Sequence, residues 1–248
     1  GGDYVSGDGK VPEEVKKKIP DNVNIIYWDY YSADKSHYEE RIKAHNDVKS
    51  GAWFAGGLWN WIGYAPHNTF SLKASKAAME ACREQHVQDV FLTLWGDNGA
   101  ECSKFAMLPS LYFSAQTAHG IRDIDVIKQG FYEKYGIPFD DFMLVDLPGT
   151  ANDTDTVDND NDCVLNPDKY MLFNDCLVGL YDSTVRDSDA SSYADCAKKL
   201  RKLEDNPDYG YIFKTLRTLC EVLSVKFDIG VRARNAYDRN DKKALSEI

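Results

Sequence analysis

The stretch that decides the fold is Val90-Phe91-Leu92-Thr93-Leu94-Trp95-Gly96-Asp97, a short apolar run that ends in an indole and a carboxylate. Residues 25–31 and 55–61 are two earlier apolar runs with tryptophan-rich, polar ends. Because side chains alternate along a strand, residues two positions apart share a face. The pairs that share a face are then Trp28 with Tyr30, Trp59 with Trp61, and Trp95 with Asp97. Aromatic faces cover sugar C–H surfaces and carboxylates accept hydrogen bonds from hydroxyls, so the three ends predict the wall of a carbohydrate pocket.

Helical patterns separate these three strands. We expect helices at about residues 36–50 and 71–85, and a further helix that begins near Ser103. Strands that alternate with helices of about 10 to 15 residues indicate parallel βαβ units. Since all three strand ends carry polar and aromatic groups, the sequence predicts one side of a (β/α)8 barrel, whose active site lies at the carboxyl ends of the strands.

Only three βα units can be read from the sequence, whereas a closed barrel of this type needs about eight. We expect the chain to be the carboxy-terminal part of a larger enzyme; the alternative is that the missing strands belong to another chain. The predicted fold class is α/β plus α. Residues 1–115 form the C-terminal part of a (β/α)8 catalytic barrel, made of its last three βα units, and residues 116–248 form an α-helical C-terminal domain. Apolar residues recur at helical spacing over residues 124–132, 193–203, 209–228 and 229–238.

Composition excludes several classes of partner. The formal net charge of −11 and the scattered lysines and arginines disfavour nucleic acid. No run approaches the roughly 18 apolar residues of a membrane span, and residues 1–10 have no apolar secretory core. None of the six cysteines forms a CxxC pair, and Cys82, Cys176 and Cys220 lie within apolar stretches. In a chain of this length we expect reduced thiols and a cytoplasmic protein, with disulfides as the alternative.

No cofactor or metal is expected. The acidic residues 158–162 suggest a calcium loop, but an EF-hand needs a glycine and a bidentate acid where this chain has Cys163 and Lys169. We therefore expect a solvated acidic loop within residues 151–162.

The candidate pocket residues have structural alternatives. Trp59 and Trp61 line the site, or else they are core indoles. Trp95 lines the pocket and Asp97 binds sugar hydroxyls, or else Trp95 is a buried indole beside a helix-capping turn. Tyr30 donates its phenolic hydrogen to a substrate oxygen, or else its hydroxyl is satisfied by the backbone. His67 has no identifiable carboxylate partner and is expected to form hydrogen bonds within its loop.

The three strand ends resemble the last three strands of the catalytic barrel in glycoside hydrolase family 20. The resemblance is closest to its bacterial subgroup of exo-acting β-N-acetylhexosaminidases with a helical carboxy-terminal domain. The segments that carry it are Tyr27-Trp28-Asp29-Tyr30-Tyr31, Gly57-Leu58-Trp59-Asn60-Trp61 with Ala65-Pro66-His67-Asn68, and Trp95-Gly96-Asp97-Asn98-Gly99-Ala100-Glu101. Residues 139–144, 166–175 and 179–182 resemble the helical domain of that subgroup.

The resemblance implies substrate-assisted retaining hydrolysis, in which the 2-acetamido carbonyl of the substrate attacks its own anomeric carbon. An adjacent Asp-Glu pair orients the acetamido group and donates the proton, but no Asp-Glu dipeptide occurs in this chain. The isolated chain is therefore expected to be inactive. It would need the missing N-terminal half of the barrel to act on glycans that end in N-acetylglucosamine or N-acetylgalactosamine.

Only pocket roles are carried over from the family. The sugar and acetamido walls are assigned to Trp28, Trp59, Trp61 and Trp95. Tyr30 is expected to bond the acetamido group, with Tyr31 as the second choice, and Asp97 to bind distal hydroxyls with the help of Glu101. The alternatives are a non-catalytic carbohydrate-binding module and a purely structural helical partner.

Overall fold

The structure is a computed structural model that describes residues 11–150, 167–185 and 189–248. The acidic residues 151–162 and the amino-terminal residues 1–10 lie outside this description, as does Cys163. The chain divides into two compact units, which are described separately. The sheet unit holds residues 11–58, 69–94 and 110–127, and the helical unit holds residues 59–68, 95–109 and the described residues from 128 onward.

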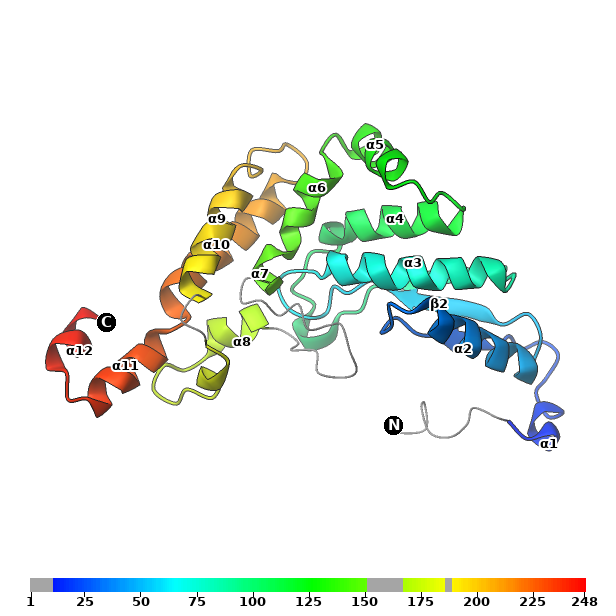
Figure 1. Ribbon diagram of the computed structural model, residues 1–248, viewed down its shortest axis with the longest axis horizontal. Helices are drawn as coiled ribbons and strands as arrows, with labels where there is room; N and C mark the ends of the chain where they lie inside the picture. The colour runs from blue at the N-terminus through cyan, green and yellow to red at the C-terminus, as the bar shows by residue number, and fades with distance from the viewer. Residues whose placement is uncertain (1–10, 151–166, 186–188) are drawn as a thin grey trace. The chain divides into compact units, whose positions relative to one another are not determined.

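The sheet unit is built around three parallel strands in the order β1-β2-β3 (Figure 1). Its elements are α1 (Glu13–Lys16), β1 (Ile26–Trp28), α2 (Lys35–Val48), β2 (Trp53–Gly57), α3 (Asn68–Glu84), β3 (Val90–Thr93) and most of α4 (Leu108–Ala118). The three predicted strands, their parallel direction and the helices between them are confirmed. Each strand is shorter than predicted, and β2 and β3 end before their tryptophans.

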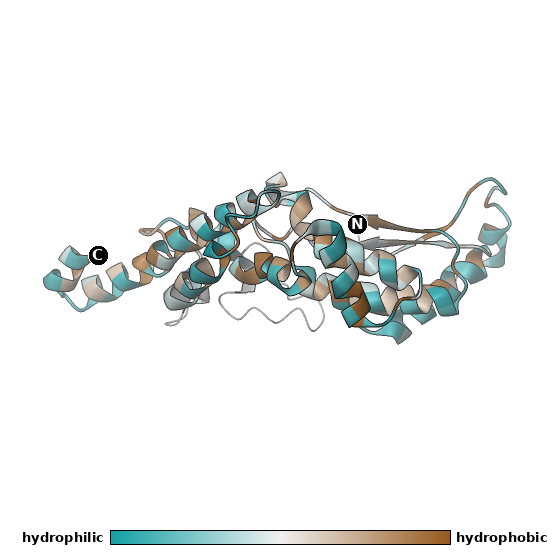
Figure 2. Ribbon diagram, turned by 90° about the horizontal axis from the view of Figure 1, so that it is seen from above, coloured by the Kyte–Doolittle hydropathy of each residue, from teal (hydrophilic) through white to brown (hydrophobic). Residues whose placement is uncertain are grey.

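One face of the sheet forms the core of this unit. Tyr27, Phe54 and Val90 lie side by side across the three strands. They pack against residues of both neighbouring helices, among them Tyr38, Ile42, Ala78, Met79 and Cys82. On the other face, Trp28 is 50% exposed and Phe91 is 41% exposed. Figure 2 draws part of the sheet in brown, the colour of hydrophobic residues. Helices therefore cover one face of the sheet, and the opposite face keeps apolar side chains at the surface.

The start of α2 illustrates how local sequence positions these elements. Asp34 precedes the helix in an extended conformation, and its carboxylate accepts a hydrogen bond from Ser36 N at 2.9 Å. This contact satisfies one of the backbone N–H groups that have no partner within the first turn of a helix.

The helical unit contains most of the carboxy-terminal half of the chain. Its elements are η2 (Asp97–Gly99), η3 (Lys104–Met107), most of α5 (Ile124–Tyr135), α6 (Phe139–Phe142), η4 (Met143–Asp146), α7 (Leu147–Thr150), α8 (Pro167–Phe173), η5 (Asp182–Thr184), α9 (Asp189–Arg201), α10 (Gly210–Lys226), α11 (Ile229–Asp238) and α12 (Lys242–Glu247). Helices α9 and α10 pack side by side (Figure 1). The helices predicted at residues 124–132, 193–203, 209–228 and 229–238 are confirmed as α5, α9, α10 and α11.

The buried face of α10 follows the helical spacing of its apolar residues. Ile212, Leu216, Leu219 and Leu223 recur every three or four positions and are all buried. These positions form one stripe on a helix with 3.6 residues per turn, so burial of this stripe stabilises the helix. The spacing of apolar residues is therefore sufficient to predict both the helix and its buried side.

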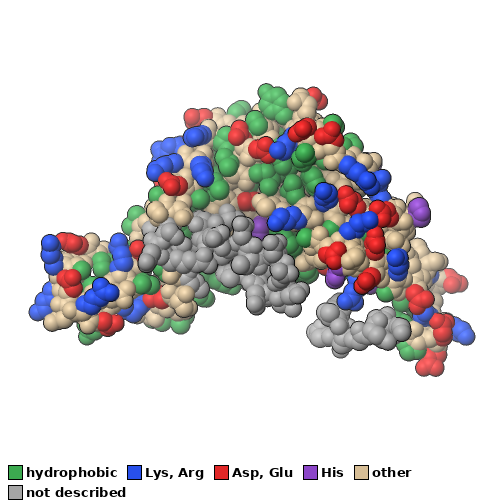
Figure 3. All heavy atoms as spheres, in the orientation of Figure 1, with side chains coloured by type: hydrophobic (Ala, Val, Ile, Leu, Met, Phe, Trp, Pro, Cys, Tyr) green, Lys and Arg blue, Asp and Glu red, His purple; other side chains and the backbone are tan. Residues whose placement is uncertain are grey.

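The charged side chains at the surface and the state of the cysteines relate to the partners and the redox environment expected from the sequence. Acidic and basic side chains are interspersed over the region of α2 and α3 in Figure 3. The chain has six cysteines, and the five that lie in the described residues are free thiols. Within the described ranges, the structure contains no helix with the length and hydrophobicity to span a bilayer.

Candidate carbohydrate-binding site

The second strand end, residues 58–68, is a loop that places two indoles against each other. The strand β2 ends at Gly57, so Trp59 and Trp61 lie beyond it rather than on alternate positions of a strand. Their ring centroids are 5.2 Å apart, and Trp59 is 1% and Trp61 6% exposed. The ring of His67 meets Trp59 edge-on at 6.5 Å, and His67 N donates a hydrogen bond to Trp59 O at 2.8 Å. The loop therefore returns on itself around Trp59.

The third strand end is tied to the second by a buried amide. Asn60 is 1% exposed, and its Nδ2 donates a hydrogen bond to Trp95 O at 2.8 Å. Lys104 Nζ donates to the same carbonyl oxygen at 2.8 Å. Beyond Trp95, Asp97 begins the short helix η2 and is exposed. These contacts bring the predicted residues Trp59, Trp61 and Trp95 into one part of the helical unit.

Asp168, on α8, holds the loop that follows Trp61. Its Oδ2 accepts hydrogen bonds from Tyr64 N at 3.1 Å and Ala65 N at 3.2 Å, and its Oδ1 accepts one from Lys169 N at 2.8 Å. Gly63 allows this close approach, because a Cβ at this position would overlap Asp168 Oδ1 and force the carboxylate to move. Burial raises the pKa of the Asp168 carboxyl from 3.8 to about 6, and the backbone N–H groups that donate to it oppose this shift.

The end of the same loop is held by a second buried carboxylate. Asp146 Oδ1 accepts hydrogen bonds from Asn68 N at 3.0 Å and from Asn68 Nδ2 at 2.9 Å. Asn68 Nδ2 also donates to Ala106 O at 2.9 Å, in the segment that follows the third strand end. All three residues are buried. The loop after β2 is thus fixed by side-chain contacts at both of its ends.

Glu101 is the last residue of the third strand end, residues 95–101, and it forms an ion pair with Lys169. Both side chains are partly exposed, at 28% and 19%. The hydrogen bond from Lys169 lowers the pKa of the Glu101 carboxyl. Asp168 contacts the loop of the second strand end, and Lys169, the next residue of α8, contacts the third strand end.

The first strand end belongs to the sheet unit. Tyr30 is half-buried, and its ring lies over Gly57, where a Cβ would be 2.6 Å from Tyr30 Cδ1. The ring centroids of Tyr30 and Tyr31 are 4.6 Å apart, and Tyr31 is exposed. A glycine at position 57 therefore allows the Tyr30 ring to lie close to the backbone of β2.

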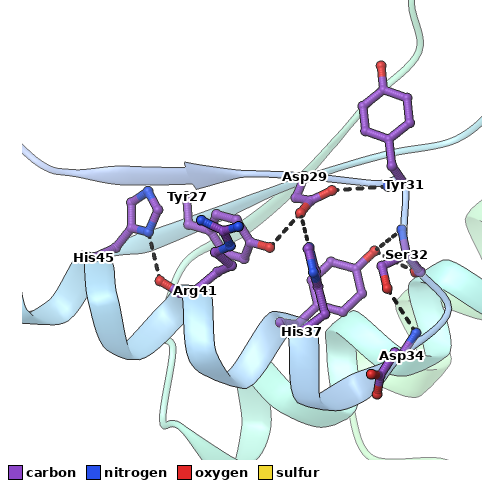
Figure 4. A network of polar contacts seen from close by, with 9 residues as sticks. Tyr27, Asp29, Tyr31, Ser32, Asp34, His37, Arg41 and His45 are labelled. Atoms are coloured by element: carbon purple, nitrogen blue, oxygen red, sulfur yellow. Dashed lines mark hydrogen bonds and ion pairs between the residues drawn. The ribbon is translucent and has the colours of Figure 1, made fainter. Parts of the chain in front are cut away.

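Asp29 and Tyr27 face helix α2 (Figure 4). Asp29 Oδ2 accepts a hydrogen bond from Tyr27 Oη at 2.6 Å and lies 2.6 Å from His37 Nε2, and Asp29 Oδ1 accepts one from Tyr31 N at 3.0 Å. Burial raises the pKa of the Tyr27 hydroxyl, and the nearby Asp29 carboxylate raises it further. Because side chains alternate along a strand, Asp29 shares with Tyr27 the side of β1 that α2 covers, and its contacts with α2 agree.

The sheet unit also contains a small hollow between the sheet and its helices. It has a volume of about 180 Å³ and its lining includes Asp29, Tyr30, Gly57, Ser75 and Met79. Ligand pockets are commonly about 300–1,000 Å³. This hollow is thus too small for a sugar ring with its substituents.

The predicted residues therefore fall into two groups. Trp59, Trp61, Trp95, Asp97 and Glu101 lie in the helical unit, whereas Trp28 and Tyr30 lie in the sheet unit. Their convergence at one rim stays a prediction. Over the described ranges, no group of three or more His, Cys, Asp or Glu side chains has a metal-binding arrangement.

Sequence reasoning missed Asn60, Asp168 and Lys169 as structural partners of the candidate site. Asp168 lies more than 100 positions from the backbone N–H groups that it holds, so no local pattern signals the contact. The one signal in the sequence is Gly63, just after the two tryptophans, because a glycine there indicates close approach of another group.

Comparison with known proteins gives one family match. Residues 140–248 match the family model of the Glycoside Hydrolase 20C C-terminal domain. No curated protein matches the chain. The matched segment includes α8 to α12, and with them both residues of α8 that contact the strand ends. The match confirms that the chain resembles the carboxy-terminal portion of a glycoside hydrolase family 20 protein.

Proposed function

We propose that this chain is the carboxy-terminal portion of an exo-β-N-acetylhexosaminidase that removes terminal N-acetylhexosamine by substrate-assisted retaining hydrolysis. The observation that carries the proposal is the match of residues 140–248 to the Glycoside Hydrolase 20C C-terminal domain. Parallel βα units precede the matched segment, which is the order that a barrel followed by a helical domain requires. The proposed boundary lies between residues 115 and 116.

The sheet unit supports the barrel part of the proposal. In a (β/α)8 barrel, helices cover the outside of the parallel strands, and the other face of the strands looks inward. Helices α2 and α3 cover one face here, while Trp28 and Phe91 are exposed on the other. We propose that the missing strands, supplied by the amino-terminal half of the barrel, cover this apolar face.

The proposed roles of the site residues follow from their chemistry. Among the four tryptophans assigned to the aromatic walls, Trp28 and Trp95 present their rings to the sugar and its acetamido group. Trp61 and Trp59, which are 6% and 1% exposed, support the wall from within the loop. Asp97 is exposed and its carboxylate accepts hydrogen bonds from sugar hydroxyls. Glu101 already pairs with Lys169, which assigns it a supporting role beside Asp97.

Tyr30 is proposed to donate a hydrogen bond to the acetamido group, with Tyr31 as the second choice. By holding the acetamido oxygen near the anomeric carbon, this contact favours the intramolecular attack. The groups that orient the acetamido nitrogen and protonate the leaving oxygen would come from the amino-terminal half of the barrel. The free thiols support a reducing, cytoplasmic environment as part of the proposal.

The experiment that tests the proposal compares this chain with the longer protein that also contains the amino-terminal half of the barrel. We expect the longer protein to hydrolyse nitrophenyl N-acetylglucosaminide or N-acetylgalactosaminide, and this chain alone to be inactive. Asp97→Ala should lower kcat/KM in the longer protein by about 100-fold, because the hydrogen bonds of a carboxylate with hydroxyls are worth about 1.5–3 kcal/mol each. Asp195→Ala, at an exposed residue of α9, is the matched control.

Two results would change the assignment. Hydrolysis by this chain alone would refute the need for an upstream proton donor. N-acetylglucosamine binding by the isolated chain, together with no hydrolysis by the longer protein, would instead favour a non-catalytic carbohydrate-binding module.

A further inference from the structure

We propose that Asp168 and Lys169 of α8 act as positioning residues for the sugar pocket, with Asp168 holding the second strand end and Lys169 holding the third. We call this pair the α8 clamp. The inference rests on the proposed function for the identity of the ligand, a terminal N-acetylhexosamine. It assigns to the helical domain a direct part in shaping the pocket.

The first half of the clamp is the contact of Asp168 with the loop after Trp61. Its buried carboxylate accepts hydrogen bonds from two consecutive backbone N–H groups, those of Tyr64 and Ala65. Gly63 lets the carboxylate approach the loop, since a Cβ would lie 3.1 Å from Asp168 Cγ and overlap Oδ1. Hydrogen bonds from backbone N–H groups to a charged acceptor are stronger than those between neutral groups. Asp168 therefore restrains the backbone of the loop three and four residues after Trp61.

The second half is the ion pair between Lys169 and Glu101. An exposed pair contributes about 0.2–1 kcal/mol to stability, so its main effect is on the position of the segment that carries it. Glu101 follows Asp97 closely, and a left-handed residue, Ala100, lies between them. Lys169 thus restrains the carboxyl end of the segment that presents Asp97.

The clamp is itself anchored in the helical domain. Lys226 Nζ, at the end of α10, donates a hydrogen bond to Leu172 O in α8. Met171 of α8 is buried. Because α10 packs along α9 through a continuous buried stripe, α8 is attached to the most extensive helical pairing of this unit.

A hydrogen bond between the second and third strand ends completes the arrangement. Asn60 Nδ2 joins the second strand end to Trp95 O of the third, as described above. The two strand ends are then connected to each other through Asn60 and to α8 through Asp168 and Lys169. Such a closed set of contacts holds the loops in one geometry before the ligand arrives, which lowers the entropic cost of binding.

The test uses charge exchange across the Lys169–Glu101 pair in the longer protein. We expect Lys169→Glu to raise KM for nitrophenyl N-acetylglucosaminide by about 5- to 10-fold with a smaller change in kcat, because a loosened rim weakens binding of the sugar. The double variant Lys169→Glu with Glu101→Lys restores the opposite charges and should recover KM to within about 3-fold of the parent. Lys198→Glu, in an exposed pair within α9, is the matched control and should leave KM unchanged.

Two results of the charge exchange would overturn the clamp. One is a KM for Lys169→Glu equal to that of the control variant. The other is a double variant as impaired as Glu101→Lys alone, because Glu101 would then act through its own carboxylate on the sugar.

A second measurement does not depend on ligand or activity. Amide hydrogen exchange of Tyr64 and Ala65 is measured in this chain and in Asp168→Ala, with Asp195→Ala as the control. The clamp predicts exchange about 10- to 100-fold faster at these two amides in Asp168→Ala than in the control. Equal exchange would overturn the clamp. A longer protein that neither binds nor hydrolyses N-acetylhexosaminides would refute the proposed function, and the exchange result would still decide whether the clamp exists.

Discussion

Replacing Gly63 with alanine should destabilise the helical unit by a predictable amount. The added Cβ would overlap Asp168 Oδ1, so the carboxylate must move away from the loop. That movement breaks its hydrogen bonds with Tyr64 N and Ala65 N, which are 3.1 and 3.2 Å long. Hydrogen bonds to a charged group contribute about 1.5–3 kcal/mol each, and partial relaxation recovers part of this. We expect the free energy of unfolding to fall by about 2–4 kcal/mol.

The assay is urea unfolding of the chain, followed by circular dichroism and by tryptophan fluorescence. Gly149→Ala is the matched control, since a Cβ there meets its nearest neighbours, Ala65 Cβ and Pro66 O, at an ordinary 3.9 Å. In the Asp168→Ala background, Gly63→Ala should cost less than 1 kcal/mol, because the atom that it overlaps is gone. The reasoning is refuted if Gly63→Ala costs no more than Gly149→Ala, or if its cost is the same with and without Asp168.

The remaining predictions concern pH and the first strand end. Burial raises the pKa of Asp168 from 3.8 to about 6, so its contribution to stability is full below pH 4 and is lost as the pH rises through 6. Urea unfolding should therefore show the stability of the parent falling by about 1–3 kcal/mol relative to Asp168→Asn between pH 4 and 7, and parallel pH profiles would contradict this. Asp29→Ala removes the acceptor of the buried Tyr27 hydroxyl and should cost about 1–3 kcal/mol, measured by thermal unfolding. Gly57→Ala displaces the Tyr30 ring and should lower kcat/KM of the longer protein by about 10-fold or more; an unchanged value would contradict the role of Tyr30.

The positions of strands and helices were predictable because they depend on local patterns. The apolar spacing of α10 and the alternation of strands with helices both leave a signal within a short window. The ends of the strands were less predictable. The loop with Trp59 and Trp61 continues the apolar composition of β2, but its backbone bonds with His67 and its Asn60 side chain with Trp95 instead of continuing the ladder.

The aromatic residues of the candidate site can be chosen from the sequence, and their role in sugar binding stays a prediction; the contacts that support them could not be predicted. Tryptophans and an acid at strand ends are visible as composition, and their chemistry suggests sugar binding. The supports depend on contacts between distant segments, such as Asp168 with Tyr64 and Lys169 with Glu101. No short-range pattern encodes such pairs, because each partner has an ordinary local sequence.

Residues 59–68 and 95–109 belong to the helical unit, which affects how the carboxy-terminal domain can be exchanged between related proteins and how these segments evolve. A cut at the proposed boundary near residue 115 would leave these loops on one fragment and the side chains that hold them, Asp168 and Lys169, on the other. If the proposed function holds, chimaeras that exchange the carboxy-terminal domain should therefore lose sugar affinity unless both loops are exchanged with it. Substitutions in α8 and in these loops are expected to become fixed together in lineages that carry this arrangement.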